Sequence, residues 1–339
     1  MAPMPLPERE LIAQLRRFVL PAGRAQLAAG AKAAIRLGMG DDCAVLRIGP
    51  ALDCLVTTDF SLEGIHFRRS WHSPESVGHR CLARGLSDIA AMGGEPVAAF
   101  LSLALPGTLP QAWVRAFFRG LLRLAEQHQV TLAGGDTSES PTGVLADVVV
   151  LGTVPKGQAI LRSGARPGNR IFVSGTLGGS AAAFTHMGTH RKKVDERQFP
   201  RHFYPEPRIR LGRMLRERKI ATAMIDTSDG LSTDLAHICE ESGVGAEIDA
   251  GSIPSARVRQ PPRSVDLNLA LHGGEDYELL FSVSARARVP RVLAGVALTE
   301  IGRITSRRKI MLRRMDGKTE PLKPRGWEHF RETQSRSRT

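Results

Sequence analysis

The chain has 339 residues, of which 42% are hydrophobic and 24% are charged, a balance typical of globular proteins, and its length favours two domains. No apolar run approaches the roughly 18 residues that a membrane-spanning helix needs, so we expect no membrane partner. The net charge of +13 is compatible with a nucleic-acid partner, but only 5% of the residues are aromatic and no basic segment interleaves them for base stacking, so we expect none.

The start of the chain and its cysteines both bear on the compartment. Residues 1–21 (MAPMPLPERELIAQLRRFVLP) lack an apolar signal core and predict a short amphipathic helix carrying Glu8 and Glu10, which argues against secretory or organellar targeting. The cysteines are scattered without C-x-x-C spacing, a pattern typical of reduced thiols rather than of a disulfide frame or a zinc site. They are Cys43, Cys54, Cys81 and Cys239. We therefore expect a cytoplasmic protein.

The first half of the chain alternates predicted strands and helices. Residues 52–59 (LDCLVTTD) predict a strand that ends on polar residues. A helix is expected from Ser73-Pro74 to Gly93-Gly94, because Ser and Pro favour a helix start and Gly its end. Residues 97–106 (VAAFLSLALP) predict a strand buried on both faces, and residues 110–129 predict a helix with one apolar stripe. Shorter strands follow at 130–136 and 143–154.

A change of composition then marks a candidate domain junction. Residues 155–169 are rich in Gly, Pro and basic side chains, and the alternation restarts after them. The basic stretch at 188–202 fits no pattern that we can assign. We expect an α/β fold with mixed sheets in two α/β domains. Their predicted bounds are 1–154 and 155–330, followed by a disordered tail at 331–339.

Aspartates recur where the predicted strands end. They are Asp41, Asp42, Asp59, Asp136, Asp226 and Asp229, and Asp88 interrupts the apolar face of a helix. Ligands of parallel α/β sheets gather beyond the carboxyl ends of the strands, so we expect these side chains to meet there. Carboxylates crowded in a partly dry cleft repel one another unless cations lie between them. Oxygen ligands of this kind favour Mg²⁺.

Each acidic position also has a purely structural interpretation. Asp41-Asp42 is compatible with a loop turn, and Asp59 with a helix cap. Asp88 could pair with Arg84 one helical turn earlier. Asp229 could cap the helix that follows it. Taken singly, each of these alternatives is the simpler one, and it is the recurrence of the acids that indicates a metal site.

The signals for phosphate binding are less standard. Gly317-Lys318-Thr319 resembles the end of a Walker A loop, but Leu312 occupies the place of its first Gly. The chain has neither a dinucleotide fingerprint nor a protein-kinase H-R-D loop. A bound nucleotide would therefore depend on Mg²⁺ and on the backbone amides of Gly-rich turns such as GTLGGS and AGGD.

In this order, the motifs resemble those of the thiamine-monophosphate kinase family. That family belongs to the ATP-binding superfamily of aminoimidazole ribonucleotide synthetase. The matching stretches are GMGDDCAVL, TTDFSLEGIHF, LSDIAAMGGEP, LAGGDT, ILRSGARPG, VSGTLGGSAAA, IDTSDGLSTDLAHI, GGEDYELLF and the terminal GWEHF. They run from about residue 38 to residue 330, so the resemblance covers nearly the whole chain.

The resemblance implies ATP-dependent phosphorylation of thiamine monophosphate to thiamine diphosphate. It also implies a homodimer formed through the N-terminal sheet, and several Mg²⁺ ions. The implied metal ligands are Asp42, Thr57, Thr58, Asp59, Asp88, Asp136, Asp226 and Asp229. The implied ATP contacts are Gly135, Asp136, Arg162 and Ser228, and the implied substrate contacts are His66, Glu275 and Trp327.

These residue types suit the implied chemistry. The acceptor is a phosphate monoester that is already anionic near neutral pH, so the reaction requires no general base. Mg²⁺-assisted in-line transfer then depends on positioning and charge neutralisation. Trp327 could stack on the cationic thiazolium ring and Glu275 could offset its charge, although either residue could instead be structural.

Two departures from the family pattern bear on the site. Ser138-Glu139-Ser140 follows GGDT where we expect Thr-Arg-Gly. If that Arg contacts phosphate, its task must pass to another residue, such as Arg162. Alternative functions are a synthetase of the same superfamily and a non-catalytic binder of phosphate ligands or nucleic acid. A selenophosphate synthetase would need a reactive Cys in a Gly-rich N-terminal segment, which this chain lacks.

Overall fold

The computed structural model describes residues 10–14, 35–38, 40–190, 194–259 and 262–330. Most of the predicted N-terminal helix and the tail at 331–339 lie outside these residues. Residues 10–14 are helical, as expected. Within the described residues, no helix is long and apolar enough to cross a membrane.

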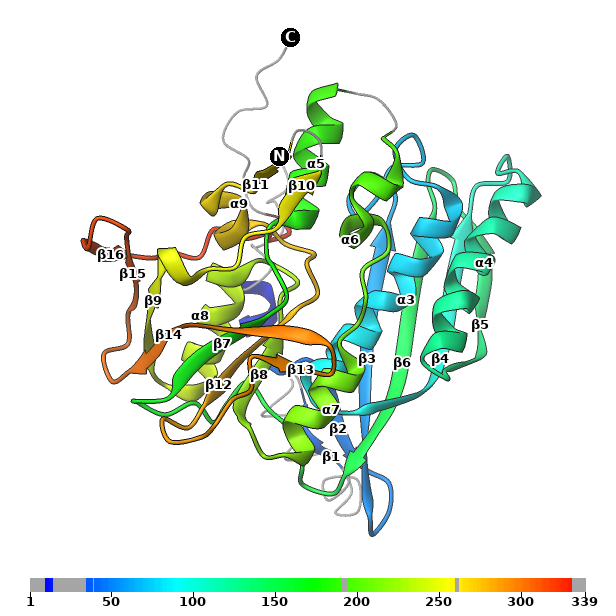
Figure 1. Ribbon diagram of the computed structural model, residues 1–339. Helices are drawn as coiled ribbons and strands as arrows, with labels where there is room; N and C mark the ends of the chain where they lie inside the picture. The colour runs from blue at the N-terminus through cyan, green and yellow to red at the C-terminus, as the bar shows by residue number, and fades with distance from the viewer. Residues whose placement is uncertain (1–9, 15–34, 39, 191–193, 260–261, 331–339) are drawn as a thin grey trace.

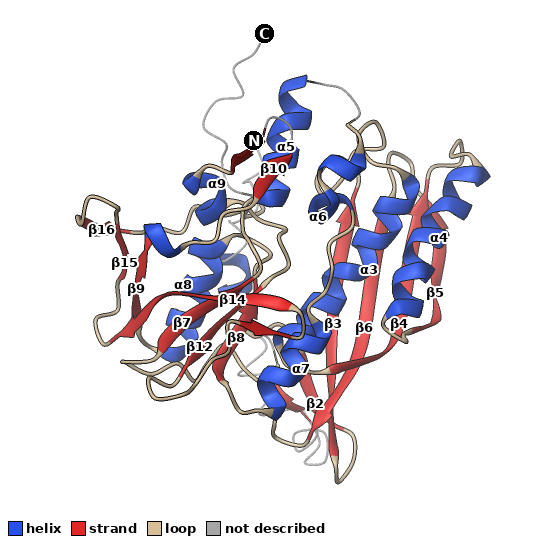
Figure 2. Cartoon of the chain, viewed as in Figure 1, coloured by secondary structure: helices blue, strands red, loops and turns tan. Residues whose placement is uncertain are grey.

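The mixed α/β architecture is confirmed, with two main sheets that lie side by side (Figures 1 and 2). The first sheet has the spatial order β1 (Ile35–Leu37), β2 (Ala44–Arg47), β3 (Leu52–Leu62), β6 (Leu145–Pro155), β4 (Glu95–Leu105), β5 (Thr131–Glu139). The second has the order β16 (Thr319–Pro321), β15 (Ile310–Arg313), β9 (Gly245–Asp249), β14 (Val296–Thr305), β7 (Arg170–Ser174), β12 (Leu279–Val283), β8 (Ala221–Asp226). A short strand β13 (Val292–Leu293) pairs with β14, and β10 (Arg257–Arg259) pairs with β11 (Pro262–Ser264).

The helices cover these sheets in layers. They are α3 (Pro74–Ala91), α4 (Gln111–Gln127), α5 (Gly179–His190), α6 (Pro200–Phe203), α7 (Ile209–Glu217), α8 (Leu231–Ser242) and α9 (Leu267–His272), with 3₁₀ turns η1 (Glu196–Gln198) and η2 (Ala250–Ser252). In Figure 2, α3 and α4 lie against the first sheet and α8 lies against the second. The residues 156–169 run from β6 to β7 without helix or strand. The domain boundary at 154/155 stays a prediction.

The helix α3 begins and ends where the sequence predicts. Ser73 caps its N-terminus by accepting a hydrogen bond from the backbone N–H of Ser76, and Pro74 occupies the first turn. Two glycines bring α3 and α4 together: a Cβ on Gly78 would lie 1.9 Å from the Phe117 carbonyl oxygen, and one on Gly120 would lie 1.9 Å from that of Glu75. This close contact fixes the helix that carries Asp88.

The expectation of a strand buried on both faces at 97–106 is wrong. Side chains of β4 alternate, and Val97 and Phe100 are 49% and 37% exposed. Among the described residues, only one face of the first sheet is covered, by α3 and α4. On the opposite face Phe60 is also exposed. A continuous apolar run does not reveal which of its two faces is covered by the same chain, and we name this exposed surface the open face.

The sheets are mixed, as expected, but the acids do not meet in the way that a parallel sheet would arrange them. Only β4/β5 and β9/β15 are parallel pairs in the described sheets, and the other pairs are antiparallel. The acids therefore cannot all meet at the carboxyl ends of parallel strands. They come together instead because the edges of the two sheets and α3 converge on one cavity.

The unassigned stretch at 188–202 joins the two halves of the chain. Glu196, on η1, accepts hydrogen bonds from the backbone N–H of Ser73 at 2.8 Å and from the hydroxyl of Ser76 at 3.0 Å. It thus binds the N-terminus of α3, where the helix dipole favours a carboxylate. Nearby, Nε2 of His202 lies 3.0 Å from Nε2 of His72. We call the Glu196 contact the cross-cap.

Candidate active site

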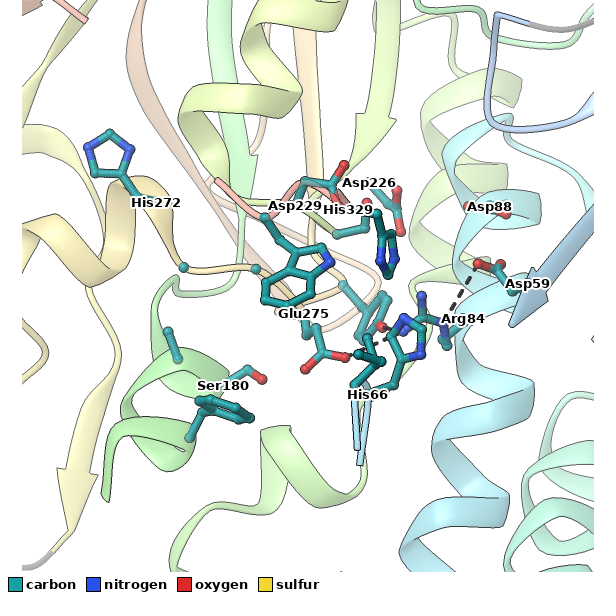
Figure 3. Close-up of a pocket in the computed structure, with 18 of the residues that line it drawn as sticks. Asp59, His66, Arg84, Asp88, Ser180, Asp226, Asp229, His272, Glu275 and His329 are labelled. Atoms are coloured by element: carbon teal, nitrogen blue, oxygen red, sulfur yellow. Dashed lines mark hydrogen bonds and ion pairs between the residues drawn. The ribbon is translucent and has the colours of Figure 1, made fainter. Parts of the chain in front are cut away.

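A cavity of about 550 Å³ lies between the two halves of the chain (Figure 3). Its walls come from β3, α3, α5, the β8–α8 loop, α9 and the segment before β12. Of the fourteen distinct residues that the sequence indicates as metal, nucleotide or substrate contacts, twelve line this cavity. Those that line it are Asp42, Thr57, Thr58, Asp59, His66, Asp88, Arg162, Asp226, Ser228, Asp229, Glu275 and Trp327.

Three carboxylates meet at one end of the cavity. Asp42 lies in the loop before β2, Asp88 lies on α3, and Asp226 ends β8. One carboxylate oxygen of each lies within 4.8 Å of the others. Burial, together with the charge of Asp42, raises the pKa of Asp226 to about 8. Burial and the charges of its acidic neighbours also raise the pKa of Asp88 well above its usual range. Three negative charges in this space repel one another strongly.

The donor set of this acidic trio fits a divalent cation. Asp42 and Asp226 are buried, and Oδ2 of Asp42 has no hydrogen-bond partner among the described residues. A buried carboxylate oxygen without a partner is costly unless a cation or a proton satisfies it. Hard oxygen ligands of this kind suit Mg²⁺ better than softer metals. Arg162 supplies a positive charge in this structure, with Nη2 2.7 Å from Oδ1 of Asp42.

Neighbouring residues on β3 alternate between the two faces of the strand. The Thr57 hydroxyl donates a hydrogen bond to Asp88, so this side chain lies on the same side as the acidic trio. The Thr58 hydroxyl donates instead to Asp147 at 2.8 Å. Asp59 lies 3.6 Å from Nε of Arg84. The pairing of Asp88 with Arg84 that the helical spacing allowed is therefore not the one observed.

The other end of the cavity holds the residues expected to contact the substrate. Nδ1 of His66 accepts a hydrogen bond from the Leu62 N–H at 3.0 Å, which leaves Nε2 as the donor. Burial, and then the charge of Arg84, lower the pKa of His66 to about 2, so the ring is neutral. Trp327 is 52% exposed, and its backbone N–H donates to the Asp229 carbonyl oxygen at 3.0 Å, which holds the ring at the cavity. An aromatic face and a neutral donor suit a flat heterocycle.

Glu275 is held in a strained backbone conformation at this end. Its φ of 65° is left-handed, which is rare for a residue with a side chain and is common at functional sites. The Glu275 N–H donates to the Ser228 carbonyl oxygen at 2.7 Å, and its carboxylate accepts from Nη2 of Arg80 at 2.7 Å. These contacts fix the carboxylate where a cationic ring could pair with it.

Comparisons with known proteins agree with this geometry. Residues 40–154 match the family model "AIR synthase related protein, N-terminal domain", and residues 166–313 match the corresponding C-terminal domain. A thiamine-monophosphate kinase of Escherichia coli (strain K12) is 37% identical over 306 residues, covering 87% of this chain and 92% of that protein. A thiamine-monophosphate kinase of Bacillus subtilis (strain 168) is 33% identical, and the match covers 88% of this chain and 94% of that protein. The chain belongs to the thiamine-monophosphate kinase family.

Solved structures extend the likeness to three dimensions. The structure described as AaThiL complexed with AMPPCP and TMP has a TM-score of 0.81 to this kinase and 31% sequence identity. The match covers 97% of this chain and all of that one. The thiamine-monophosphate kinase of Stenotrophomonas maltophilia K279a has a TM-score of 0.72 at 33% identity, over 92% and 98% of the two chains. The fold expected from the resemblance is thus confirmed.

Two residues implied by the resemblance lie elsewhere in this kinase. Gly135 and Asp136 belong to β5, at the end of the first sheet, and are not among the residues that line the cavity. Both are exposed. Asp136 pairs in register with Ser102 of β4, which places it on the open face beside Phe100. Within one chain, β6 and β4 separate these residues from β3 and its Asp59.

The turn that carries Ser228 and Asp229 is held by an acid that the sequence analysis missed. Asp234 is buried, and its Oδ2 accepts a hydrogen bond from the Gly230 N–H at 3.0 Å. Gly230, rather than Asp229, is the N-cap residue of α8, so the cap interpretation of Asp229 is wrong. The signal was available as a second Asp one turn into the helix of SDGLSTDL. Its position within the helix does not by itself indicate that its side chain contacts the preceding turn.

Stability should fall as the pH rises from 6.5 to 8 when the kinase is free of divalent cations. Asp226 and Asp276 have pKa values raised by burial to about 8 and about 7 from 3.8, so in this window the folded state holds protons that the unfolded state has lost. His66 and His72 have lowered pKa values of about 2 and about 4, and their effect appears only when the pH falls below 6.5.

Thermal unfolding in a chelator, measured at several pH values, checks this expectation. Mg²⁺ binds ionised carboxylates, so its stabilising effect should grow over the same window. A melting temperature in chelator that stays constant or rises from pH 6.5 to 8 would contradict the assignment of protonated buried acids.

Proposed function

We propose that this kinase transfers the γ-phosphoryl group of ATP to the phosphate of thiamine monophosphate, giving thiamine diphosphate and ADP with the help of several Mg²⁺ ions. The observation that carries the proposal is one cavity with a cation-binding acidic trio at one end and ring contacts at the other. The family assignment and the relative that holds AMPPCP and TMP support it.

The geometry indicates how the two anions are brought together. Asp42, Asp88 and Asp226 would hold Mg²⁺, which when bound supplies the positive charge that neutralises the polyphosphate. Asp59 and Thr57 would extend this ligand set, and Asp229 also lines the cavity. Arg162 and Ser228 would contact the nucleotide. His66, Glu275 and Trp327 would orient the thiazolium and pyrimidine rings.

The transfer itself needs no proton acceptor. An oxygen of the acceptor phosphate forms a bond to the γ-phosphorus, and the bond from that phosphorus to the β–γ bridging oxygen breaks, releasing ADP. The attacking oxygen is ionised near neutral pH because the second pKa of such a phosphate is about 6. The task of the protein is therefore to position the two anions in line and to neutralise their charge.

The test is a turnover assay with Mg-ATP and thiamine monophosphate. We expect thiamine diphosphate and ADP in equal amounts, and no product when the divalent cation is chelated. Free thiamine, other phosphate monoesters and amidine-forming substrates of the wider superfamily serve as competing acceptors. Absence of thiamine diphosphate, or product from free thiamine alone, would overturn the proposal.

We further propose that the active form is a homodimer joined through the open face. Phe60, Val97 and Phe100 expose apolar surface there, and exposed patches of this kind mark protein interfaces. Asp136 lies on the same face, and Gly135 precedes it on β5. A second copy packed against it would carry its own β5 toward the nucleotide end of the first cavity, which would account for their distance from it within one chain.

Replacing Phe100 by Asp should convert the dimer to a monomer and reduce turnover, because the charge would be buried at the interface. Sedimentation velocity measures the change in mass. Val292→Asp is the matched control, since Val292 is 58% exposed on β13, far from the open face in sequence and sheet. A Phe100→Asp variant that stays dimeric would refute the interface.

The four cysteines are all free thiols. This agrees with a reducing compartment, and we propose that the kinase acts in the cytoplasm.

A further inference from the structure

We propose that Arg84 binds the acceptor phosphate of the substrate and so acts directly in the phosphoryl transfer. This inference rests on the proposed function and deepens it, because no motif in the sequence assigns a role to this arginine. The geometry that carries it is the position of Arg84 between the acidic trio and the ring contacts.

Arg84 lies at the middle of the cavity wall. It projects from α3 one turn before Asp88, and its side chain is 16% exposed. Figure 3 shows it between Asp59 on one side and Glu275 and His66 on the other. The substrate must span this interval, since its rings belong at Glu275 and its phosphate must reach the γ-phosphoryl group held at the acidic trio. Arg84 is therefore beside the place where the acceptor phosphate has to lie.

The present contacts of Arg84 are long and can be exchanged. Its Nε is 3.6 Å from Asp59, and its Nη1 is 3.4 Å from Glu275 and 3.3 Å from the Tyr277 hydroxyl. Nε is buried and donates no hydrogen bond within the described residues. By contrast, Arg80 contacts the same Glu275 carboxylate at 2.7 Å and already offsets its charge. Arg84 thus brings a second positive charge to a carboxylate that has one partner.

Ligand binding would weaken the present contacts of the Arg84 guanidinium and leave it able to bind the acceptor phosphate. Mg²⁺ ions bound by the acids would compete for Asp59, and the cationic thiazolium ring would compete for Glu275. Arg84 would then be left with two weakened pairs and would face a dianion a few ångströms away. A planar guanidinium donates two parallel N–H···O bonds to phosphate, which fixes its orientation as well as its charge.

The chemistry gives this charge a clear task. Two anions must approach for the bond between the acceptor oxygen and the γ-phosphorus to form, and a guanidinium on the acceptor side lowers their repulsion. The chain has Glu139 where the family resemblance predicts an arginine after GGDT. The alternative phosphate contact, Arg162, is bound at 2.7 Å to Asp42 at the nucleotide end. Arg84 is the arginine on the substrate side that lines the cavity.

The first experiment separates phosphate recognition from packing. Calorimetry with Mg²⁺ and no nucleotide compares the affinities for thiamine monophosphate and thiamine in the wild type, Arg84→Met and Arg84→Lys. We expect Arg84→Met to lower the preference for the phosphorylated ligand by about 10- to 100-fold and to leave thiamine affinity nearly unchanged. Arg84→Lys should restore part of the preference, because lysine keeps the positive charge but cannot donate two parallel hydrogen bonds to the phosphate.

The second experiment measures turnover. Arg84→Met should reduce kcat by about 100- to 1000-fold, the range found when one donor to a transition-state anion is removed, with little change in KM for ATP. Arg119→Met is the matched control, because Arg119 is a 62% exposed arginine on α4. It should leave both measurements unchanged.

The outcomes distinguish this inference from the proposed function. Equal losses of affinity for both ligands, or an Arg84→Met variant with wild-type preference and kcat, would overturn the role of Arg84 while leaving the kinase reaction intact. A wild type that makes no thiamine diphosphate would overturn the reaction. If Arg84→Met does not fold, Arg84→Lys decides the question: a partial loss of the preference for the phosphorylated ligand and of kcat would support the role of Arg84, and wild-type values of both would overturn a paired guanidinium contact.

Discussion

Replacing Asp88 by Asn should reduce turnover by about 100- to 1000-fold and should at the same time stabilise the cation-free protein. Asp88 is one of three carboxylates whose oxygens lie within 4.8 Å of one another. Removing its charge weakens cation binding and lowers kcat. It also removes an acid whose burial is costly, either ionised beside its acidic neighbours or held protonated, while the Thr57 hydroxyl can still donate to the amide oxygen. We expect the free energy of unfolding in chelator to rise by about 1 kcal/mol.

Two measurements check both halves of this prediction. Steady-state assays give kcat, and thermal unfolding with chelator or with Mg²⁺ gives the stability. Mg²⁺ should stabilise the wild type more than the variant. Glu126→Gln, an exposed acid on α4, is the control and should behave as wild type in each measurement. A variant that keeps full turnover, or that melts below the wild type in chelator, would show that Asp88 is not a member of a repelling, cation-binding trio.

Replacing Glu278 by Gln should destabilise the fold by about 3 kcal/mol, because it leaves buried arginine charge without its partner. Glu278 is fully buried. Its oxygens accept from Nε and Nη2 of Arg208 at 2.8 and 2.6 Å and from Nη1 of Arg201 at 2.9 Å. The Ser174 hydroxyl donates to the same carboxylate at 2.5 Å. The amide of Gln cannot accept at both of its ends.

Chemical denaturation measures this loss, and the substrate affinity of the folded fraction should remain close to that of the wild type. Glu320→Gln removes an acid from an exposed pair with Arg314 and should change the stability little. A Glu278→Gln variant as stable as the wild type would mean that the arginines find solvent or other partners when the carboxylate charge is removed.

The motif GGEDYELLF shows how far a sequence motif can be interpreted. It holds three acids, and the sequence analysis assigned a role only to Glu275, which lines the cavity. Asp276 instead accepts hydrogen bonds from the Gly178 and Ser180 N–H groups before and within α5. Glu278 forms the buried arginine contacts. One pattern therefore combines a site residue with two residues that hold the surrounding segments.

The elements themselves were the most predictable part, because their signals are local. The start of α3 at Pro74 follows from its Ser-Pro pair, and the apolar stripe of α4 predicts its buried face. Which acids meet depends on contacts between distant parts of the chain. Asp42 and Asp226 are separated by most of the chain, and their convergence was implied only by the repeated pattern and by the family resemblance.

What sequence reasoning missed has a common cause. The open face could not be predicted from the sequence, because the strand β4 is rich in Ala and Leu on both of its faces and shows no clear alternation of apolar and polar residues. Arg84 was considered only as a partner for Asp88, because helical spacing suggests that pair. The structure instead directs Arg84 to Asp59 and Glu275, which lie on other elements. Side-chain direction, rather than spacing along the helix, decided the contact.

The cross-cap has a consequence for how such a protein can be divided or recombined. Glu196 lies 123 residues beyond Ser73, yet it completes the end of the helix that carries Arg84 and Asp88. A gene segment ending near residue 155 would encode α3 with its Ser73 cap but without the contact from Glu196. If the second half of the chain were exchanged with that of a relative, the N-terminus of α3 would keep this contact only if the new segment placed a carboxylate where Glu196 lies. Recombination within this lineage is therefore constrained by a contact that neither half contains alone.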